Sequence, residues 1–273
     1  MNRAEREIHA KNQVKDMEDL CAYDINKCVV NSVVYLDTDT IPGVMTSTPY
    51  KTIMRVENSD TVSAIFNCDT DYFKVAVLNF ASYNNPGGGF LRGSMAQEEA
   101  LCHKGILFNV LNNVRFRKEF YEPNHRNSNR GLYGNNLIYT PNVLFADEYV
   151  CTYVDVITCA APNAKVAQEK YRVSENELTD AMRSRIQHIL FSAYNNQVDV
   201  LILGAFGCGV FGNNPYTVAH LFKEELETTF KGIFREVIFA IPNSSSNNFL
   251  AFNRTFEGDK WHKKQFKRST KYR

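Results

Sequence analysis

The sequence predicts an α/β fold in which helices cover both faces of a central sheet, a three-layer α/β/α arrangement. Short, almost continuously apolar segments rich in Val and Ile recur along the chain, and such segments are typical of strands buried on both faces. Longer segments with helical periodicity lie between them. This alternation favours a layered α/β/α domain over an all-α or all-β one.

The predicted strands are short and apolar. Five segments have the pattern of a buried strand: residues 29–36, 74–80, 153–159, 198–204 and 236–241. Residues 137–145 form a weaker candidate, because Pro141 lacks the N–H that a strand donates to its neighbour.

Two helices have recognisable starts. Ser174 and Glu177 have the spacing of a capping box and predict a helix that extends to about residue 195. Asn214 followed by Pro215 has the pattern of an N-cap and a first-turn proline, and predicts the start of another helix. Residues 122–136, rich in Asn and Gly, are predicted to be the longest surface loop.

The composition is that of an ordinary globular protein. The chain has 273 residues, of which 44% are hydrophobic and 22% charged, so wholesale disorder and a coiled coil are disfavoured. No apolar segment reaches the roughly 18 residues that a bilayer span needs. Residues 1–19 are charged throughout and lack the apolar centre of a signal peptide, so we expect an intracellular, cytoplasmic protein.

Charge is unevenly distributed. The 31 Lys and Arg residues nearly balance the 30 Asp and Glu residues, for a net charge of +1. Residues 259–273 contain seven basic residues and one acid, which leaves residues 1–258 at −5. This basic tail is interpreted either as a solvated chain end or as a weak contact for a polyanion through phosphate neutralisation.

Cysteine usage predicts neither disulfides nor a metal site. The chain has seven Cys, an odd number, without a CxxC pair or closely spaced His ligands. Cys102 and His103 are adjacent, but neighbouring side chains on a helix diverge by about 100°, so we interpret both as structural. No metal and no cofactor is expected.

The most informative segment follows the predicted strand at residues 74–80. It contains three consecutive glycines, Gly87 to Gly89, and then the adjacent carboxyls Glu98 and Glu99 at the start of a predicted helix. Glycine is favoured where the backbone needs positive φ or must approach another group closely. At the carboxyl end of a strand in an α/β sheet, that group is often a ligand. The alternative is a tight turn followed by acids that favour the positive end of a helix.

A second glycine-rich segment, residues 204–213, follows the strand predicted at 198–204. Its four glycines would expose backbone N–H groups to an anion such as a diphosphate. It lacks the Lys of a P-loop, and the acid expected of a dinucleotide-binding G-x-G-x-x-G segment falls inside the next predicted helix, near Glu227. Phe206 and Phe211 would either stack on a ribose or base, or pack beneath the loop.

Together these segments resemble the bacterial-type poly(ADP-ribose) glycohydrolases, a branch of the macrodomain superfamily. The resemblance lies in Gly87-Gly88-Gly89, seven further residues and then Gln97-Glu98-Glu99, together with residues 204–213, and it covers roughly residues 50 to 255. It implies a macrodomain with a central mixed sheet and an extra N-terminal helical region. The expected division is a helical and strand extension at 1–50, a macrodomain-like catalytic domain at 51–258, and the basic tail at 259–273.

The resemblance also implies an activity and roles for individual residues. The activity is hydrolysis of the ribose–ribose O-glycosidic bond of poly(ADP-ribose), releasing ADP-ribose, with Glu99 as general acid and base and Glu98 beside it contacting ribose hydroxyls. We expect Glu98 and closure of the site to raise the pKa of Glu99. Asp60 would bind adenine, although it would equally serve as a helix N-cap. The remaining expected substrate-binding residues are Asn79 and Asn85 at the distal ribose, Gln97, and the loop residues Gly87, Gly88, Gly89, Gly207, Cys208, Gly209, Val210, Phe211 and Gly212.

Three alternatives stay open at this stage. One is a mono-ADP-ribosyl hydrolase acting on protein or nucleic acid, so the expected partners are poly(ADP-ribose) or ADP-ribosylated macromolecules and the product ADP-ribose. Another is a non-catalytic macrodomain reader, which needs the loops but not the acidic pair. A dinucleotide-dependent oxidoreductase is the most distant.

Overall fold

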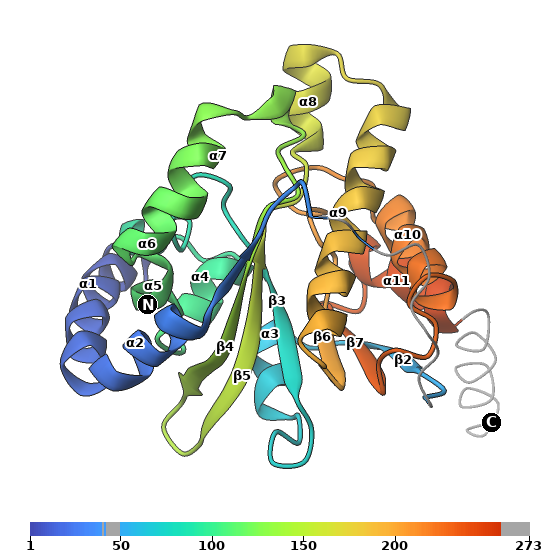
Figure 1. Cartoon of the computed structure of the whole chain (residues 1–273). Helices are drawn as coiled ribbons and strands as arrows, with labels where there is room; N and C mark the ends of the chain where they lie inside the picture. Colours follow the sequence, from blue (N-terminus) through green and yellow to red (C-terminus); the bar gives the residue numbers. More distant parts are fainter. Residues whose placement is uncertain (40, 42–49, 258–273) are drawn as a thin grey trace, which may run out of the picture.

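A mixed seven-stranded sheet forms the centre of the molecule in a computed structural model that describes residues 1–39, 41 and 50–257 (Figure 1). The strand order is β1-β4-β5-β3-β6-β7-β2. Strands β5, β3, β6, β7 and β2 are parallel, whereas β4 runs antiparallel to β5, and β1 antiparallel to β4. The strands are β1 (Val33–Tyr35), β2 (Ile53–Glu57), β3 (Val75–Phe80), β4 (Leu137–Ala146), β5 (Cys151–Cys159), β6 (Val200–Leu203) and β7 (Glu236–Ala240).

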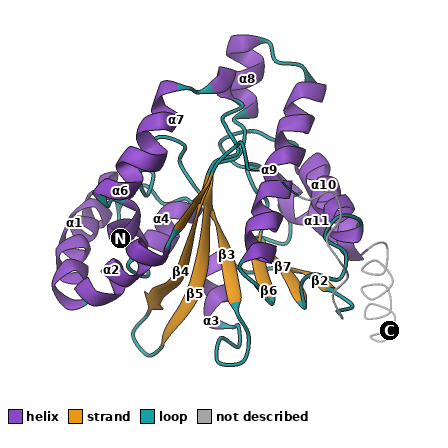
Figure 2. Cartoon of the chain, viewed as in Figure 1, coloured by secondary structure: helices purple, strands orange, loops and turns teal. Residues whose placement is uncertain are grey.

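Helices cover both faces of this sheet (Figure 2). One face packs against α1 (Arg3–Leu20), α2 (Ala22–Asn31), α3 (Thr61–Phe66), α4 (Gln97–Cys102), α5 (Leu107–Leu111), α6 (Val114–Phe116) and the π-helical turn η2 (Arg117–Tyr121). The other packs against α9 (Glu175–Asn195), α10 (Pro215–Glu227) and α11 (Asn247–Glu257). The remaining short elements are η1 (Phe90–Arg92), α7 (Glu122–Arg126), η3 (Asn129–Gly131) and α8 (Ala164–Tyr171).

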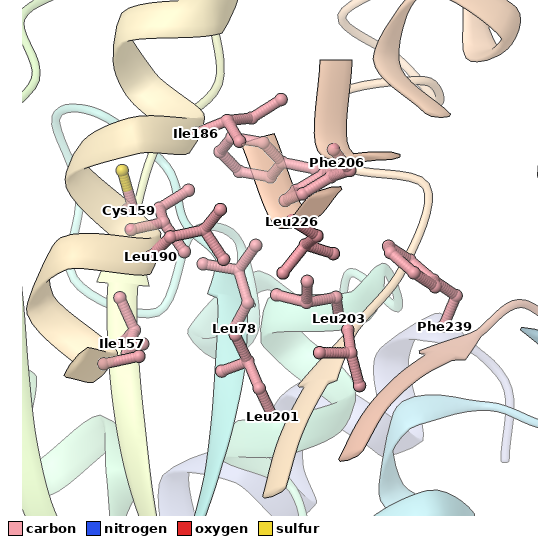
Figure 3. Close-up of a cluster of buried hydrophobic side chains, with 14 of the residues drawn as sticks. Leu78, Ile157, Cys159, Ile186, Leu190, Leu201, Leu203, Phe206, Leu226 and Phe239 are labelled. Atoms are coloured by element: carbon pink, nitrogen blue, oxygen red, sulfur yellow. The ribbon is translucent and has the colours of Figure 1, made fainter. Parts of the chain in front are cut away.

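Successive side chains of each strand point to opposite faces of the sheet, so the core consists of two layers. In β3, Val75 and Val77 belong to the cluster beneath α1 to α6, while Ala76 and Leu78 belong to the cluster beneath α9 to α11. Figure 3 shows the second cluster, in which Ile186 and Leu190 of α9 lie over the apolar side chains of the central strands. Both faces of the sheet are therefore buried, as the apolar strand pattern predicts. The three-layer α/β/α fold is confirmed.

Most predicted elements are present. The strands at residues 74–80, 153–159, 198–204 and 236–241 correspond to β3, β5, β6 and β7. Helix α9 begins with the expected capping box, in which Ser174 accepts a hydrogen bond from the Glu177 amide, and Asn214 caps α10. The carboxyl end of β3, Asn79 and Phe80, lies at the edge of the sheet at which the parallel strands β5, β6, β7 and β2 also end.

Two predictions about local structure were wrong, and a weaker one was confirmed. Residues 29–36 do not form one strand, because α2 continues to Asn31 with Cys28 and Val29 buried beneath it, and only Val33–Tyr35 joins the sheet. The weaker strand at 137–145 is present as β4, in which a register shift between Thr140 and Val143 accommodates Pro141. Residues 122–136 are not one loop, since they contain α7 and η3.

The N-terminal helices pack directly on the sheet. Ala10 of α1 and Cys28 of α2 belong to the same apolar cluster as β3, and β1 forms an edge of the sheet beside β4. The division at residues 50 and 258 stays a prediction. The basic tail at 259–273 lies outside the described residues. Among the helices of the described ranges, none has an apolar stretch that could cross a bilayer.

Candidate active site

A cavity of about 1010 Å³ opens at the edge of the sheet where the parallel strands end. Its walls come from the N-terminal turns of α3 and α4 and from the loops that follow β3, β6 and β7. The predicted site residues among its lining are Asp60, Gln97, Gly207, Gly209, Val210 and Phe211. Its volume is at the upper end of the range for small-molecule sites. The edge of an α/β sheet at which parallel strands end is also where such sites commonly lie.

The triple glycine forms a turn that no other residue type fits. Gly87 and Gly88 both have positive φ, +63° and +59°. A Cβ on Gly88 would lie 2.6 Å from Glu99 Oε1 and 2.9 Å from Glu98 Oε2. The turn therefore needs glycine for its backbone conformation, and also because two carboxyl groups lie against it.

Glu98 is a buried carboxyl held by groups from β3 and the segment after it. Its side chain is 3% exposed. Oε2 accepts a hydrogen bond from the Ser82 amide at 2.7 Å, and Oε1 accepts one from Asn79 Nδ2 at 3.3 Å. Burial raises the pKa of Glu98 to about 8, although these hydrogen bonds act in the opposite direction. Glu98 is therefore protonated at neutral pH.

Glu99 is held by two backbone amides. Oε1 accepts a hydrogen bond from the Gly89 amide, and Oε2 accepts one from the Ala96 amide, both at 2.8 Å. The Ala96 contact caps the N-terminus of α4. Ala96 lines the cavity, whereas Glu98 and Glu99 are buried and are not among its lining residues. The geometry thus separates the two neighbouring acids, because each has its own set of donors.

Gln97 joins the start of α4 to the end of β3. Its Oε1 accepts a hydrogen bond from the Phe80 amide, and its Nε2 donates one to the Leu78 carbonyl, both at 2.8 Å. The side chain lines the cavity, but both ends of its amide are already bonded to β3. In this structure Gln97 therefore fixes the position of the acidic pair that follows it.

Asn79 and Asn85 differ in their surroundings. Asn79 is fully buried at the end of β3, and its Oδ1 has no hydrogen-bond partner among the described residues. Asn85 is exposed, and its carbonyl accepts a hydrogen bond from the Gly88 amide within the glycine turn. Asn79 thus presents an unused acceptor next to Glu98, while Asn85 lies at the surface of the turn.

The second glycine segment presents free backbone N–H groups. Gly207 and Gly212 have φ of +71° and +73°, and they bracket a turn that lines the cavity. Within the described part of the chain, the amides of Gly209, Val210 and Phe211 donate no hydrogen bond. In the first segment, by contrast, the Gly88 amide is used by Asn85 and the Gly89 amide by Glu99. The second loop is therefore the better anion cradle.

Cys208 and Phe206 of this loop pack against the apolar core, and Phe206 also lines the cavity. Cys208 packs against the core, and burial raises the pKa of its thiol to about 12. Phe206 is fully buried, with its ring 5.5 Å from that of Phe80. Any contact of Cys208 with a ligand must therefore come from its backbone.

This arrangement can be compared with known proteins. Residues 4–147, more than half of the chain, match the family described as the microbial-type PARG (poly(ADP-ribose) glycohydrolase) catalytic domain. The chain belongs to this family. The family match begins within α1, so it includes the N-terminal helices. A comparison with curated proteins gives no significant match.

Solved structures of bacterial PARG enzymes are similar over almost the whole chain. The enzyme from Thermomonospora curvata is 30% identical and has a TM-score of 0.84, covering 93% of this chain and 100% of its own. Its complex with the inhibitor ADP-HPD has a TM-score of 0.80 at 29% identity, with the same coverage. The Deinococcus radiodurans enzyme in complex with ADP-ribose is 30% identical, with a TM-score of 0.76, and covers 85% of this chain and 96% of its own. The macrodomain-like fold expected for a PARG is thereby confirmed.

Asp60 lies where either predicted role is possible. It caps α3, since Oδ1 accepts from the Ser63 amide and Oδ2 from the Ser63 hydroxyl, both at 2.9 Å. It also lines the end of the cavity formed by α3. The N-cap is a feature of the structure, and the contact with adenine stays a prediction for this PARG.

Sequence reasoning missed several residues that position the site. Asn213 Nδ2 donates to the carbonyls of Pro162 and Gly207, at 2.8 and 2.9 Å, and so ties the second loop to the end of β5. Arg185 of α9 is 1% exposed and donates to the carbonyls of Ala160 and Leu132. Asn213 ends the second glycine-rich segment, which was the one available signal, whereas Arg185 lies outside both glycine-rich segments.

Proposed function

We propose that this chain hydrolyses the ribose–ribose O-glycosidic bond of poly(ADP-ribose) and releases ADP-ribose. The observation that carries the proposal is the acidic pair: Glu98 and Glu99 are each held by backbone amides, and they directly follow Ala96 and Gln97, which line a cavity of about 1010 Å³. A reader of ADP-ribose would need the cavity and the free amides, but not two immobilised carboxyls.

The substrate is proposed to lie along the cavity, with its adenine near Asp60. Its diphosphate would accept hydrogen bonds from the amides of Gly209, Val210 and Phe211, which have no other acceptor among the described residues. The distal ribose would then reach the acidic pair, where Asn79 Oδ1 is an unused acceptor for a ribose hydroxyl. Asn85 would contact the same sugar from the surface of the turn. This placement needs no surplus of basic side chains, which suits a chain whose residues 1–258 carry a net charge of −5.

The proposed chemistry uses Glu99 as acid and then as base. Glu99 donates a proton to the departing 2′ oxygen as the bond to the distal ribose breaks, and an oxocarbenium-like ribose forms. Glu99 then takes a proton from the water that attacks this ribose, which restores the acid. Because burial raises the pKa of Glu98 to about 8, the protonated form of Glu98 predominates at neutral pH and adds no negative charge beside Glu99. Its proton would donate a hydrogen bond to a ribose hydroxyl.

The test is to incubate the protein with labelled poly(ADP-ribose) and to measure free ADP-ribose, beside the variant Glu99→Gln. The matched control is Glu169→Gln, which makes the same change at an exposed position of α8. We expect Glu99→Gln to lose at least about a hundredfold in rate while it still binds ADP-ribose. Binding without release by the wild type would identify a reader. Full activity of Glu99→Gln would refute the role of Glu99 as general acid and base. Faster cleavage of mono-ADP-ribosylated protein than of polymer would refute poly(ADP-ribose) as the preferred substrate.

Two further expectations concern the basic tail and the cellular location of the protein. We propose that the basic tail at 259–273 attracts the polymer through its excess positive charge. Its deletion should therefore reduce the salt dependence of association and change the rate of the chemical step less. A series of KM and kcat measurements at increasing NaCl concentration separates the two effects. The cytoplasmic location stays a prediction.

A further inference from the structure

Two tyrosine rings stack next to the segment whose Ser82 amide holds Glu98. The rings of Tyr83 and Tyr133 have centroids 4.1 Å apart and planes within 12° of each other. The edge of the pair meets Phe211, whose ring centroid is 6.1 Å from that of Tyr133. Tyr83 is buried, while Tyr133 is partly exposed and so forms the outer layer of the stack.

The stack is built on a rigid base. The Tyr83 hydroxyl donates a hydrogen bond to the Asn127 carbonyl and accepts one from the Gly134 amide, both at 3.1 Å. Asn124 Nδ2 donates to the Tyr83 carbonyl at 3.2 Å. The inner ring is therefore fixed from both its backbone and its hydroxyl.

The outer ring is held in an unfavourable backbone conformation. Tyr133 has φ of +64°, a region that bulky residues rarely adopt. Its amide donates to the Ser128 carbonyl and its carbonyl accepts from Asn129 Nδ2, both at 3.2 Å. Backbone strain of this kind is retained where the position of a side chain matters. The strain here places an aromatic ring flat against Tyr83.

The stack adjoins the catalytic groups but lies outside the cavity. Tyr83 directly follows Ser82, whose amide holds Glu98, and Phe211 belongs to the cavity wall. Among the described residues, neither Tyr83 nor Tyr133 lines the cavity. In the proposed binding mode, ADP-ribose fills the cavity as far as the acidic pair. The polymer unit beyond the scissile bond would then lie outside it, and Phe211, which lines the cavity and meets the Tyr133 ring, connects the cavity to the stack.

We propose that Tyr133 binds the adenine of the polymer unit that leaves when the bond is cleaved. This inference rests on the proposed function. Every base has a π face, and stacking on an aromatic side chain is a common way to hold an adenine. The ring of Tyr133 offers such a face, supported by Tyr83 behind it. An ADP-ribose attached directly to a protein side chain has no adenine at this point, so Tyr133 favours polymer over mono-ADP-ribosylated acceptors.

The experiment compares Tyr133→Ala and Tyr133→Phe with the wild type. Ala keeps a Cβ, so the backbone cost at positive φ is the same and only the ring is removed. Tyr133→Asn is a second ring-free variant, since Asn tolerates positive φ. The matched control is Tyr149→Ala, at an exposed tyrosine in the turn between β4 and β5. The readouts are kcat/KM on poly(ADP-ribose), kcat/KM on ADP-ribose linked to a small phenol at the scissile position, and the Kd of free ADP-ribose.

We expect the ratio of the two kcat/KM values, polymer to phenol, to fall by about ten- to a hundredfold in Tyr133→Ala and Tyr133→Asn. Tyr133→Phe should keep the wild-type ratio, and the Kd of ADP-ribose should stay within about twofold in all three variants. An unchanged ratio in both ring-free variants overturns the inference. A parallel loss of ADP-ribose affinity also overturns it, because Tyr133 would then only support the loop. If the wild type cleaves no polymer, the proposed function itself fails.

Discussion

The backbone amide of Gly89 donates a hydrogen bond of 2.8 Å to Oε1 of Glu99. This contact joins the last residue of the triple glycine to the last residue of the Gln-Glu-Glu segment, ten positions along the chain. The residues between them form η1 and return the chain to the same point. The two halves of the motif therefore form one structure, in which the glycine turn is the support for the acid.

The variant Gly88→Ala tests this coupling. Alanine is strained at φ of +59°, by about 1 to 2 kcal/mol, and its Cβ would lie 2.6 Å from Glu99 Oε1. We expect a loss of at least that free energy of unfolding and a fall of more than about tenfold in kcat, because the carboxyl must move. Chemical denaturation and initial rates measure the two effects.

The matched variant for stability is Gly209→Ala. A Cβ there meets no heavy atom within 4 Å, so its free energy of unfolding should stay within about 0.5 kcal/mol of the wild type. Equal stability of Gly88→Ala and Gly209→Ala would show that the carboxyls do not rest against the glycine turn as described.

Gln97 provides a second test of how the acidic pair is held. Gln97→Met keeps the length of the side chain but removes its bonds to the Phe80 amide and the Leu78 carbonyl. Leaving those groups unpaired should cost about 1 to 3 kcal/mol of stability. If Gln97 positions the pair, kcat falls more than the affinity for ADP-ribose. The reverse pattern, with weakened binding and an unchanged kcat, would instead assign it to direct substrate contact.

The fold was predictable where burial on both faces leaves a continuous apolar segment. Val75, Val77 and Leu78 of β3 are fully or almost fully buried, and this strand was found within one residue of its predicted start. Strand β2 was missed because it lies at the edge of the sheet and Ile53 and Arg55 are exposed. Val29 was assigned to a strand because an apolar residue near a helix end and one in a strand look alike in sequence.

The sequence places the acidic pair at the start of a helix, as the structure does, but it does not say which of the two carboxyls is the more buried. The sequence predicted a raised pKa for Glu99, on the argument that Glu98 is a like charge beside it. In the structure, burial raises the pKa of Glu98 to about 8, because α4 turns this side chain beneath the end of β3. Which of two adjacent acids is buried depends on the direction of each side chain from the helix, and spacing alone does not specify it.

Asn213 and Asn214 are neighbours with separable roles. Asn213 ties the second loop to the Pro162 carbonyl, while Asn214 caps α10 by accepting from the Tyr216 amide at 2.9 Å. We expect Asn213→Ala to weaken ADP-ribose binding by about tenfold, since the free amides lose their fixed orientation. Asn214→Ala should cost about 1 kcal/mol of stability and leave that affinity unchanged. Isothermal titration with ADP-ribose distinguishes them, and equal Kd values would refute the role of Asn213.

The titration of Glu98 predicts how stability depends on pH. Its pKa rises from an ordinary 4.5 to about 8 on folding, so between these values the folded chain holds a proton that the unfolded chain has released. Stability from this group is therefore complete below about pH 4.5 and is lost as the pH rises to about 8, by at most about 1.4 kcal/mol per pH unit. Glu98→Gln carries no titrating proton, so its stability should lack this decline.

The same variant separates stability from catalysis. Above about pH 8 Glu98 loses its proton, and we expect kcat to fall there because a new negative charge then lies beside Glu99. In Glu98→Gln the high-pH decline in kcat should disappear, whatever the absolute rate. Urea unfolding and rate measurements between pH 5 and pH 9 supply both profiles. Parallel stability curves for the two proteins over that range would mean that Glu98 is ionised when folded, and that its burial beneath β3 does not control its proton.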